Sequence, residues 1–110
     1  MPDRVRTRRQ FARFASPDAR GRSGPVRVVF VDDQPEGRGL AAAYTISRKV
    51  GNAVVRNRIR RRLRVLLDEV HPSVRSGTYL IKCGNETGSL SYDQLRSHLH
   101  EALERAQLLT

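Results

Sequence analysis

Apolar residues recur at helical spacing between positions 53 and 70. Each residue turns a helix by about 100°, so these apolar side chains share one side: Val55, Ile59, Leu63, Leu66, Leu67 and Val70. Asn52 can cap the start of the helix with its side-chain oxygen. The end falls near Val70, because Pro72 should push His71 out of helical geometry. The pattern predicts an amphipathic helix over residues 53–70 whose apolar stripe faces a core.

Three stretches have the β-branched, apolar composition of strands: Val26–Val31, Leu40–Ile46 and Gly77–Cys83. In the first strand, Val28 and Phe30 face one side, and Arg27 and Val29 face the other. The turn over residues 32–39 is short, so the first two strands should pair antiparallel. The third strand follows the long helix and should therefore run parallel to the second.

A capping box, in which Ser or Thr precedes Gln by three residues, marks two further helix starts: Thr7 with Gln10, and Ser91 with Gln94. We expect a short helix over about residues 8–15 and a last helix over about residues 92–106. The last helix has its own packing stripe: Leu95, Leu99, Leu103 and Ala106. Residues 16–25 are rich in Gly, Ser and Pro, which is typical of a loop.

Positive charge is concentrated on the central helix. The 110 residues fit one domain, 1–110, with a formal net charge of +10. Six arginines fall within residues 56–64, and no acid lies between Ile46 and Leu67. A solvated basic face is the ordinary interpretation of such a helix. Here the uncompensated repulsion favours a polyanionic ligand, and the planar fork of arginine suits phosphate.

The other chemical signals in the sequence are sparse. Cys83 is the one cysteine, so an internal disulfide and a thiolate metal cage are excluded. No carboxylate cluster, histidine pair or activated nucleophile accompanies the basic residues, so we expect no catalytic residue and no metal ligand in the protein itself. No apolar run has the length of a membrane span, and the start lacks the apolar segment of a secretory signal; a cytoplasmic location is expected.

Aromatic residues accompany arginines near the start of the chain. Phe11 and Phe14 are three residues apart and share one helical face, with Arg9 and Arg13 on other faces. Aromatic side chains among cations are typical of surfaces on which an unpaired nucleic-acid strand stacks. Plain core packing is the alternative for both phenylalanines.

One run of residues resembles the signature of the bacterial ribonuclease P protein component: Ser47-Arg48-Lys49-Val50-Gly51-Asn52-Ala53-Val54-Val55-Arg56-Asn57-Arg58-Ile59-Arg60-Arg61-Arg62-Leu63-Arg64. A match of this length and order is specific, whereas an isolated Arg-Asn-Arg would not be. The likeness extends to Phe11, to Phe30 and to Ser91-Tyr92-Asp93 before the last helix. The chain departs from the family at Ala15, where a second aromatic is common, and at Ala43, where glycine is common.

The resemblance implies a small α/β (α+β) sandwich, with a central sheet of three or four strands and three helices. It also implies a left-handed crossover between the second and third strands, where general rules favour a right-handed one. The catalyst would be a large RNA that cleaves the 5′ leader from precursor tRNA. Magnesium would be bound mainly by that RNA and the substrate, and none by the protein alone. The protein would be monomeric alone and bind the RNA one to one.

The resemblance assigns two sets of site residues. The set expected to face the catalytic RNA is Ser47, Arg48, Lys49, Asn52, Arg56, Asn57, Arg58, Arg60, Arg61 and Arg64. The set expected to line the groove for the leader is Phe11, Arg13, Phe14, Val28 and Phe30. Two other functions stay open on composition: a ribosomal protein that binds ribosomal RNA, and a DNA-binding module that places the arginine helix in the major groove.

Overall fold

The computed structural model describes residues 3–4, 8–33 and 40–109. Its strands and helices in chain order are β1 (Asp3–Arg4), α1 (Arg8–Arg13), β2 (Ala19–Ser23), β3 (Val26–Val31), β4 (Leu40–Ile46), α2 (Ala53–Val70), β5 (Gly77–Cys83) and α3 (Tyr92–Arg105). The three predicted strands, the central helix and the last helix are confirmed. Thr7 lies outside the described residues. The described part of the chain has no helix that is both long and apolar enough to span a membrane.

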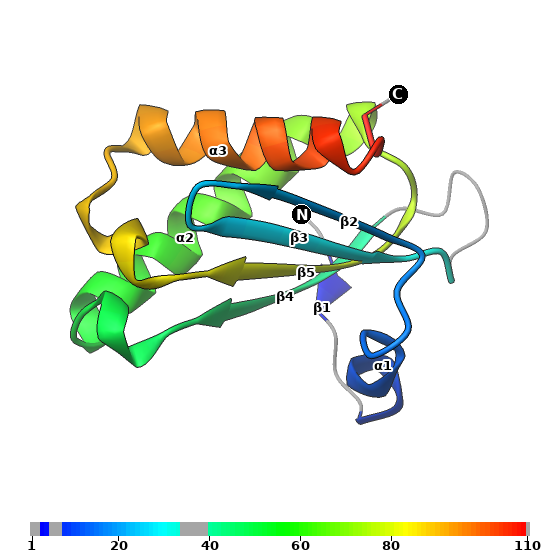
Figure 1. Cartoon of the computed structure of the whole chain (residues 1–110), viewed down its shortest axis with the longest axis horizontal. Helices are drawn as coiled ribbons and strands as arrows, with labels where there is room; N and C mark the ends of the chain where they lie inside the picture. Colours follow the sequence, from blue (N-terminus) through cyan, green and yellow to red (C-terminus); the bar gives the residue numbers. More distant parts are fainter. Residues whose placement is uncertain (1–2, 5–7, 34–39, 110) are drawn as a thin grey trace.

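The strands form one mixed sheet in the order β1-β4-β5-β3-β2 (Figure 1). β4 and β5 are parallel, as predicted, and β3 pairs antiparallel with β5. The predicted pairing of β3 with β4 is wrong, because β5 lies between them. All residues of β5 except Lys82 are buried. A strand that is apolar on both faces is stabilised most at the centre of a sheet, because helices or other side chains there bury both of its faces.

The stretch 16–25, predicted to be a loop, contains strand β2. A tight turn at Gly24, with a φ of 55°, joins β2 to β3. β2 alternates exposed arginines with small residues, so it lacks the apolar composition of a strand. The small residues are required on the side that faces α3, since a Cβ atom on Gly21 would lie 2.0 Å from the carbonyl oxygen of Ala102.

Helices α2 and α3 cover one face of the sheet, and α1 lies against the other. We call the face on the α1 side the open face. In Figure 1, β4 and β5 both point left, β5 lies above β4, and α2 passes behind the sheet. The β4–α2–β5 connection is therefore left-handed. With four strands of five or more residues and three helices, the fold is the α/β sandwich that was expected.

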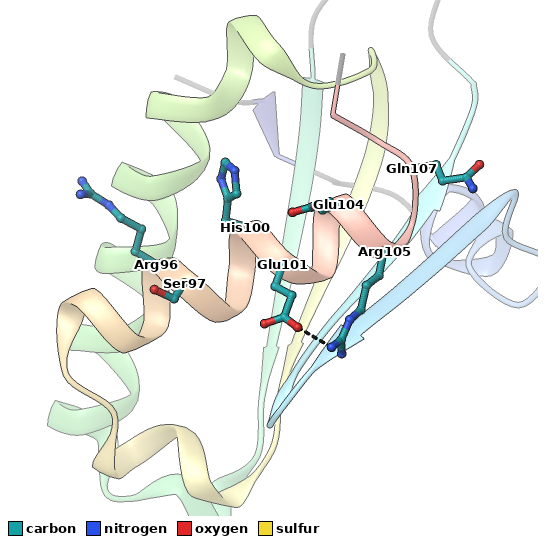
Figure 2. Close-up of a pocket in the computed structure, with 7 residues that line it drawn as sticks. All are labelled: Arg96, Ser97, His100, Glu101, Glu104, Arg105 and Gln107. Carbon is teal, nitrogen blue, oxygen red and sulfur yellow. Dashed lines mark ion pairs between the residues drawn. The ribbon is translucent and has the colours of Figure 1, made fainter.

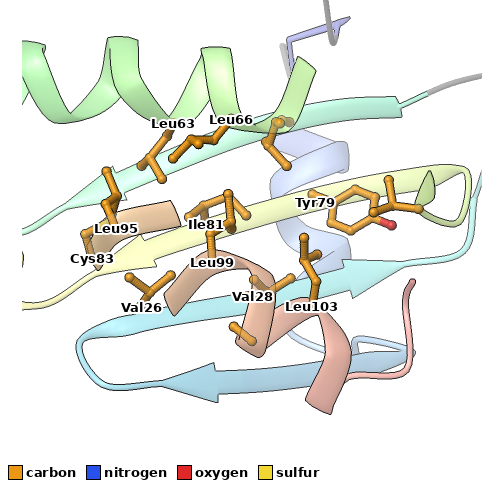
Figure 3. Packing of buried hydrophobic residues seen from close by; sticks show 14 of the residues in the cluster. Val26, Val28, Leu63, Leu66, Tyr79, Ile81, Cys83, Leu95, Leu99 and Leu103 are labelled. Carbon is orange, nitrogen blue, oxygen red and sulfur yellow. The ribbon is translucent and has the colours of Figure 1, made fainter. Parts of the chain in front are cut away.

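The main core lies between the sheet and the helices α2 and α3 (Figure 3). α2 contributes Leu63 and Leu66, and both are almost fully buried. The ring of Phe30 packs on the ring of Tyr79 with centroids 5.0 Å apart. The Tyr79 hydroxyl donates to the carbonyl oxygen of Arg75 at 2.6 Å, so its polar end is satisfied within the core. This core fixes the orientation of α2 relative to the sheet.

The ends of the helices follow the sequence signals with one exception. The side-chain oxygen of Asn52 accepts the N–H of Val55 at 3.0 Å, and the capping box of Ser91 and Gln94 is complete at the start of α3. α2 ends at Val70 as predicted. His71 nevertheless keeps helical angles (φ −46°, ψ −45°), so that part of the prediction is wrong. The chain continues directly into a 3-10 turn in which Pro72 holds an early position, where its missing N–H is not needed.

Candidate nucleic-acid interface

The arginines of α2 lie outside the buried stripe of the helix. The buried residues of α2 are Ile59, Leu63, Leu66 and Leu67, and Val55 and Val70 are partly buried. Arg58 and Arg61 are exposed together with Asn57, while the other arginines are half-buried: Arg56, Arg60, Arg62 and Arg64. The predicted amphipathic helix is confirmed, and its charged side faces away from the core.

Local interactions leave most of this charge uncompensated. In every ion pair between two described residues, the arginine comes from outside α2: Arg13 with Asp18, Arg75 with Asp32, Arg96 with Glu69, and Arg105 with Glu101. Within α2, Arg60 donates to the side-chain oxygen of Asn57 at 3.1 Å. Arg62 lies over the ring of Tyr92, 5.9 Å from its centroid. These contacts orient two guanidinium groups. They do not neutralise the positive charge, because the partners are a neutral amide and a neutral ring.

The residues just before α2 form a second part of this surface. Arg48 and Lys49 are exposed in a 3-10 turn that Ser47 caps, because its hydroxyl oxygen accepts the N–H of Lys49 at 3.2 Å. The same hydroxyl donates to the side-chain oxygen of Asn85 at 3.1 Å. The oxygen of Asn52 is engaged in the helix cap, so its amide NH₂ group is the part that can bind a ligand.

Arg64 lies close enough to β4 for its charge to act on Tyr44. Burial raises the pKa of Tyr44 to about 12, and the nearby Arg64 opposes this shift. Tyr44 is therefore a neutral hydrogen-bonding group at physiological pH. The arginines of α2 thus include one, Arg64, whose charge reaches β4.

The two phenylalanines of the N-terminal region have different environments. Phe14 is half-buried and packs on a small apolar cluster on the open face: Val29, Ala43 and Leu80. Phe11 is 48% exposed and meets Phe14 edge to face, with centroids 6.2 Å apart. Core packing therefore explains Phe14 in part, and Phe11 presents a free aromatic surface. Arg13 donates to the carbonyl oxygen of Ser16 and pairs with Asp18 at 3.4 Å.

The structure contradicts two of the residues expected in the leader groove. Val28 and Phe30 are 0% exposed, because their side chains point into the main core on the α2 and α3 side. Phe30 is enclosed by Tyr79 and by the guanidinium of Arg75, which lies 5.0 Å from its ring centroid. β3 carries valines on both sides, so hydrophobicity alone does not show which side faces the core. The arginine at position 27 was the available signal, since it marks the exposed side.

Two adjoining hollows occupy the open face. The first, of about 400 Å³, is lined by Phe14, Arg20, Gly21, Arg22, Arg27, Val28, Val29 and Lys82; Val28 borders it without exposed surface. The second, of about 450 Å³, is lined by Arg22, Gly24, Pro25, Arg27, Thr45, Ser47, Lys82, Cys83, Gly84, Asn85 and Glu86. They share Arg22, Arg27 and Lys82. These cations were missed in the sequence because they are scattered along the chain and meet only when the strands pair.

A larger hollow, of about 880 Å³, lies along the outer face of α3 (Figure 2). It is lined by Arg96, Ser97, His100, Glu101, Glu104, Arg105 and Gln107. It contains two arginines and two glutamates, and Glu101 forms an ion pair with Arg105. A surface with balanced charges does not attract a polyanion, so size alone does not make this hollow the candidate site.

The chain matches known proteins over nearly its whole length. A sequence profile of the family Ribonuclease P matches residues 2–107. The chain is 38% identical over 99 residues to the ribonuclease P protein component of Symbiobacterium thermophilum, covering 87% of this chain and 86% of that protein. It is 34% identical over 83 residues to the ribonuclease P protein component of Limosilactobacillus reuteri, covering 74% and 71%. The chain belongs to the ribonuclease P protein family.

Solved ribonuclease P proteins have the same fold. The protein of Staphylococcus aureus matches with a TM-score of 0.83 at 17% identity, and the match covers 100% of both chains. The protein of Thermotoga maritima matches with a TM-score of 0.76 at 19% identity, covering 92% of this chain and 97% of that one. The family and the fold inferred from the sequence are therefore confirmed. Membership among ribonuclease P protein components also implies an RNA partner.

Proposed function

We propose that this ribonuclease P protein binds the catalytic RNA of the enzyme through α2 and the turn before it. In this proposal the open face of the sheet holds the 5′ leader of precursor tRNA. The RNA carries out the cleavage that creates the mature 5′ end of the tRNA, and the protein assists. The observation that carries the proposal is α2 itself, a helix anchored by buried leucines that presents arginines without acidic partners in the described ion pairs.

The anchoring of α2 matters for affinity as well as for position. Leu63 and Leu67 are 0% exposed, so the backbone that carries the arginines is fixed before RNA binds. A preorganised surface loses less conformational entropy on binding than a flexible basic segment does. The residues assigned to the catalytic RNA are those of the matching signature: Ser47, Arg48, Lys49, Asn52, Arg56, Asn57, Arg58, Arg60, Arg61 and Arg64.

The leader is assigned to the open face. Phe11 offers a half-exposed ring on which a base can stack, and Phe14 with Val29 and Leu80 forms an apolar floor beneath it. Arg13 can bind a phosphate once the leader replaces its exposed ion pair with Asp18, an interaction worth little in water. Val29 and Leu80 replace Val28 and Phe30 in this assignment, because only the former pair lies on the open face.

Magnesium belongs to the RNA and the substrate in this proposal. Among the described residues no group of three or more His, Cys, Asp or Glu side chains could hold a metal ion. The contribution of the protein is to bring cations to phosphates and to fix the leader. We further propose one protein per RNA, and a cytoplasmic location.

The test is cleavage of a precursor tRNA by a bacterial ribonuclease P RNA at low magnesium, with and without the protein. We expect the protein to restore cleavage, and Arg60→Ala with Arg64→Ala to abolish that effect. Arg96→Ala removes an exposed cation of α3 that pairs with Glu69 and is not among the residues assigned to the RNA, so it should leave the stimulation intact. The proposal would be overturned if the protein did not stimulate cleavage by the cognate RNA. It would also be overturned if Arg96→Ala reduced the stimulation as much as the Arg60 and Arg64 substitutions do.

A further inference from the structure

Lysine is rare in this basic chain. Of the 21 lysine and arginine residues, only Lys49 and Lys82 are lysines, and both are exposed. The primary amine of lysine can be acylated, whereas the guanidinium of arginine stays charged. Acylation of side-chain amines is therefore confined to one residue just before α2 and one residue on the open face.

Lys82 has two arginines beside it. Arg27 of β3 lies directly opposite Lys82 of β5, and Arg22 of β2 lies opposite Arg27. Neighbouring strands are about 4.8 Å apart, so the three Cα atoms span about 10 Å. Among the described residues Arg27 and Lys82 have no ion pair or side-chain hydrogen bond, and the guanidinium of Arg22 donates to the carbonyl oxygen of Gly24 at 3.2 Å. Two guanidinium groups can therefore bind an anion next to the amine of Lys82.

The second hollow of the open face contains this group of cations. Its volume of about 450 Å³ is in the range of small-molecule sites. Arg22, Arg27 and Lys82 all line it, and Glu86 is the one acid among the described residues that do so. Lys49 lines neither hollow of the open face. Both lysines are exposed, but only Lys82 shares a hollow with two arginines.

We propose that the second hollow binds an acyl phosphate and that Lys82 is acylated by it. An acyl phosphate is a mixed anhydride in which one bridging oxygen joins a carbonyl carbon to a phosphate group. Arg22 and Arg27 bind the phosphate through charge-assisted hydrogen bonds. The carbonyl carbon is then held close to the amine of Lys82, and holding two reactants together raises the rate of their reaction.

The transfer step balances without any further reactant. Lys82 first loses one proton to water, and its neutral nitrogen attacks the carbonyl carbon to form a C–N bond. The bond between that carbon and the bridging oxygen breaks, and the phosphate leaves with its charge facing Arg22 and Arg27. One proton of the attacking nitrogen passes to the phosphate. The products are a neutral amide on Lys82 and inorganic phosphate.

The two arginines favour acyl phosphates over thioesters of coenzyme A as donors. In such a thioester a long flexible arm separates the phosphates from the reactive carbonyl group. A phosphate bound by Arg22 and Arg27 therefore does not bring that carbonyl group to Lys82. With a thioester donor we expect no preference for Lys82 over Lys49.

Acylation of Lys82 would regulate the open face. The amide is uncharged, so one of three neighbouring cations is lost. That this loss weakens binding of the 5′ leader rests on the proposed function. In that case the slope of log affinity against log salt for a leader RNA should fall by about 0.7, which is the contribution of one phosphate contact to a single strand.

The test is acetylation of the full chain by acetyl phosphate, with mass spectrometry of the peptides that contain Lys49 and Lys82. We expect the rate at Lys82 to level off as acetyl phosphate increases, because the hollow saturates, and inorganic phosphate to compete. The rate at Lys49 should rise in proportion to concentration. Arg27→Thr should slow acetylation of Lys82 by at least about tenfold at low acetyl phosphate, the usual effect of one charge-assisted hydrogen bond. Arg96→Thr also removes one cation and should change neither rate.

The acetyl ester of N-hydroxysuccinimide has no phosphate, so it measures how accessible each lysine is. With this reagent Arg27→Thr should leave the rate at Lys82 unchanged, and circular dichroism checks that the variant is folded. The proposal would be overturned by equal, unsaturated rates at both lysines with acetyl phosphate, or by an equal slowing of Lys82 with the ester. Failure of the proposed function is distinguishable, because the chain would then not stimulate ribonuclease P RNA while Lys82 is still acetylated selectively.

Discussion

Arg27→Thr should make the folded protein more stable in dilute salt. Arg27 lies between Arg22 and Lys82 on three neighbouring strands of the open face, so its replacement removes two like-charge neighbours at once. Cross-strand charge pairs are worth about 0.2 to 1 kcal/mol each, which gives about 0.4 to 2 kcal/mol for both. Threonine is a good strand residue, so the loss of repulsion is the main change expected.

The assay is urea unfolding followed by circular dichroism at low and high salt. The Debye length falls from about 30 Å at 0.01 M salt to about 3 Å at 1 M. We therefore expect Arg27→Thr to raise the unfolding free energy at about 0.01 M salt and to have no such effect at about 1 M salt. Arg96→Thr is the contrasting variant, because it breaks the 2.9 Å ion pair with Glu69 and should give no gain. A loss of stability in Arg27→Thr at low salt, or a gain that persists at 1 M, would refute the argument from repulsion.

Three further predictions concern the core and the open face. Leu63→Ala should lower the unfolding free energy by about 2 to 5 kcal/mol in urea titration, since the side chain is 0% exposed and leaves a cavity; a loss below 1 kcal/mol would show that the site collapses. Phe11→Ala should weaken binding of leader-containing precursor tRNA by about 1 to 3 kcal/mol, with little change in melting temperature, because the Phe11 ring is largely exposed. Phe14→Ala should weaken binding and also lower the melting temperature, because Phe14 packs on Val29 and Leu80. A Phe11→Ala protein that unfolds would show that the ring is structural instead. Burial raises the pKa of Cys83 to about 11, so its thiol should react slowly with a thiol reagent at pH 8 until the protein is unfolded. The unfolded chain ionises this thiol at lower pH than the folded one, so the unfolding free energy should fall as pH rises from about 9 to about 11, and a Cys83→Ala protein should lack that contribution.

The sequence predicted the elements with strong local signals. α2 combines a cap at Asn52, a six-residue apolar stripe and a stop near Val70, and these agree with one another and with the structure. The capping box at Ser91 marked α3 in the same way. Such signals are local, so they do not depend on how the chain folds back on itself.

The missed features depend on contacts between distant segments. β2 is a strand because β3 pairs with it and α3 packs on Gly21, and neither partner is visible in residues 16–25. The same limit applies to the side of β3 that faces the core: Phe30 is buried by Tyr79, which is far away in the sequence. The three neighbouring cations of the open face, Arg22, Arg27 and Lys82, come from three strands, so only the register of the sheet reveals that they meet. The basic helix could be found from the sequence because all its arginines lie in one segment.

The central place of β5 has a consequence for how the chain folds as it is synthesised. β5 is the last strand in the chain, yet it joins β3 to β4 and completes the sheet. A nascent chain that ends at Val70 contains β3, β4 and α2 but lacks the strand that all three pack against. Its apolar edges stay unpaired, and a fragment of this kind is prone to aggregation rather than stable. Folding should therefore be a late and cooperative event that waits until Cys83 has left the ribosome, at a rate limited by contacts between distant parts of the chain.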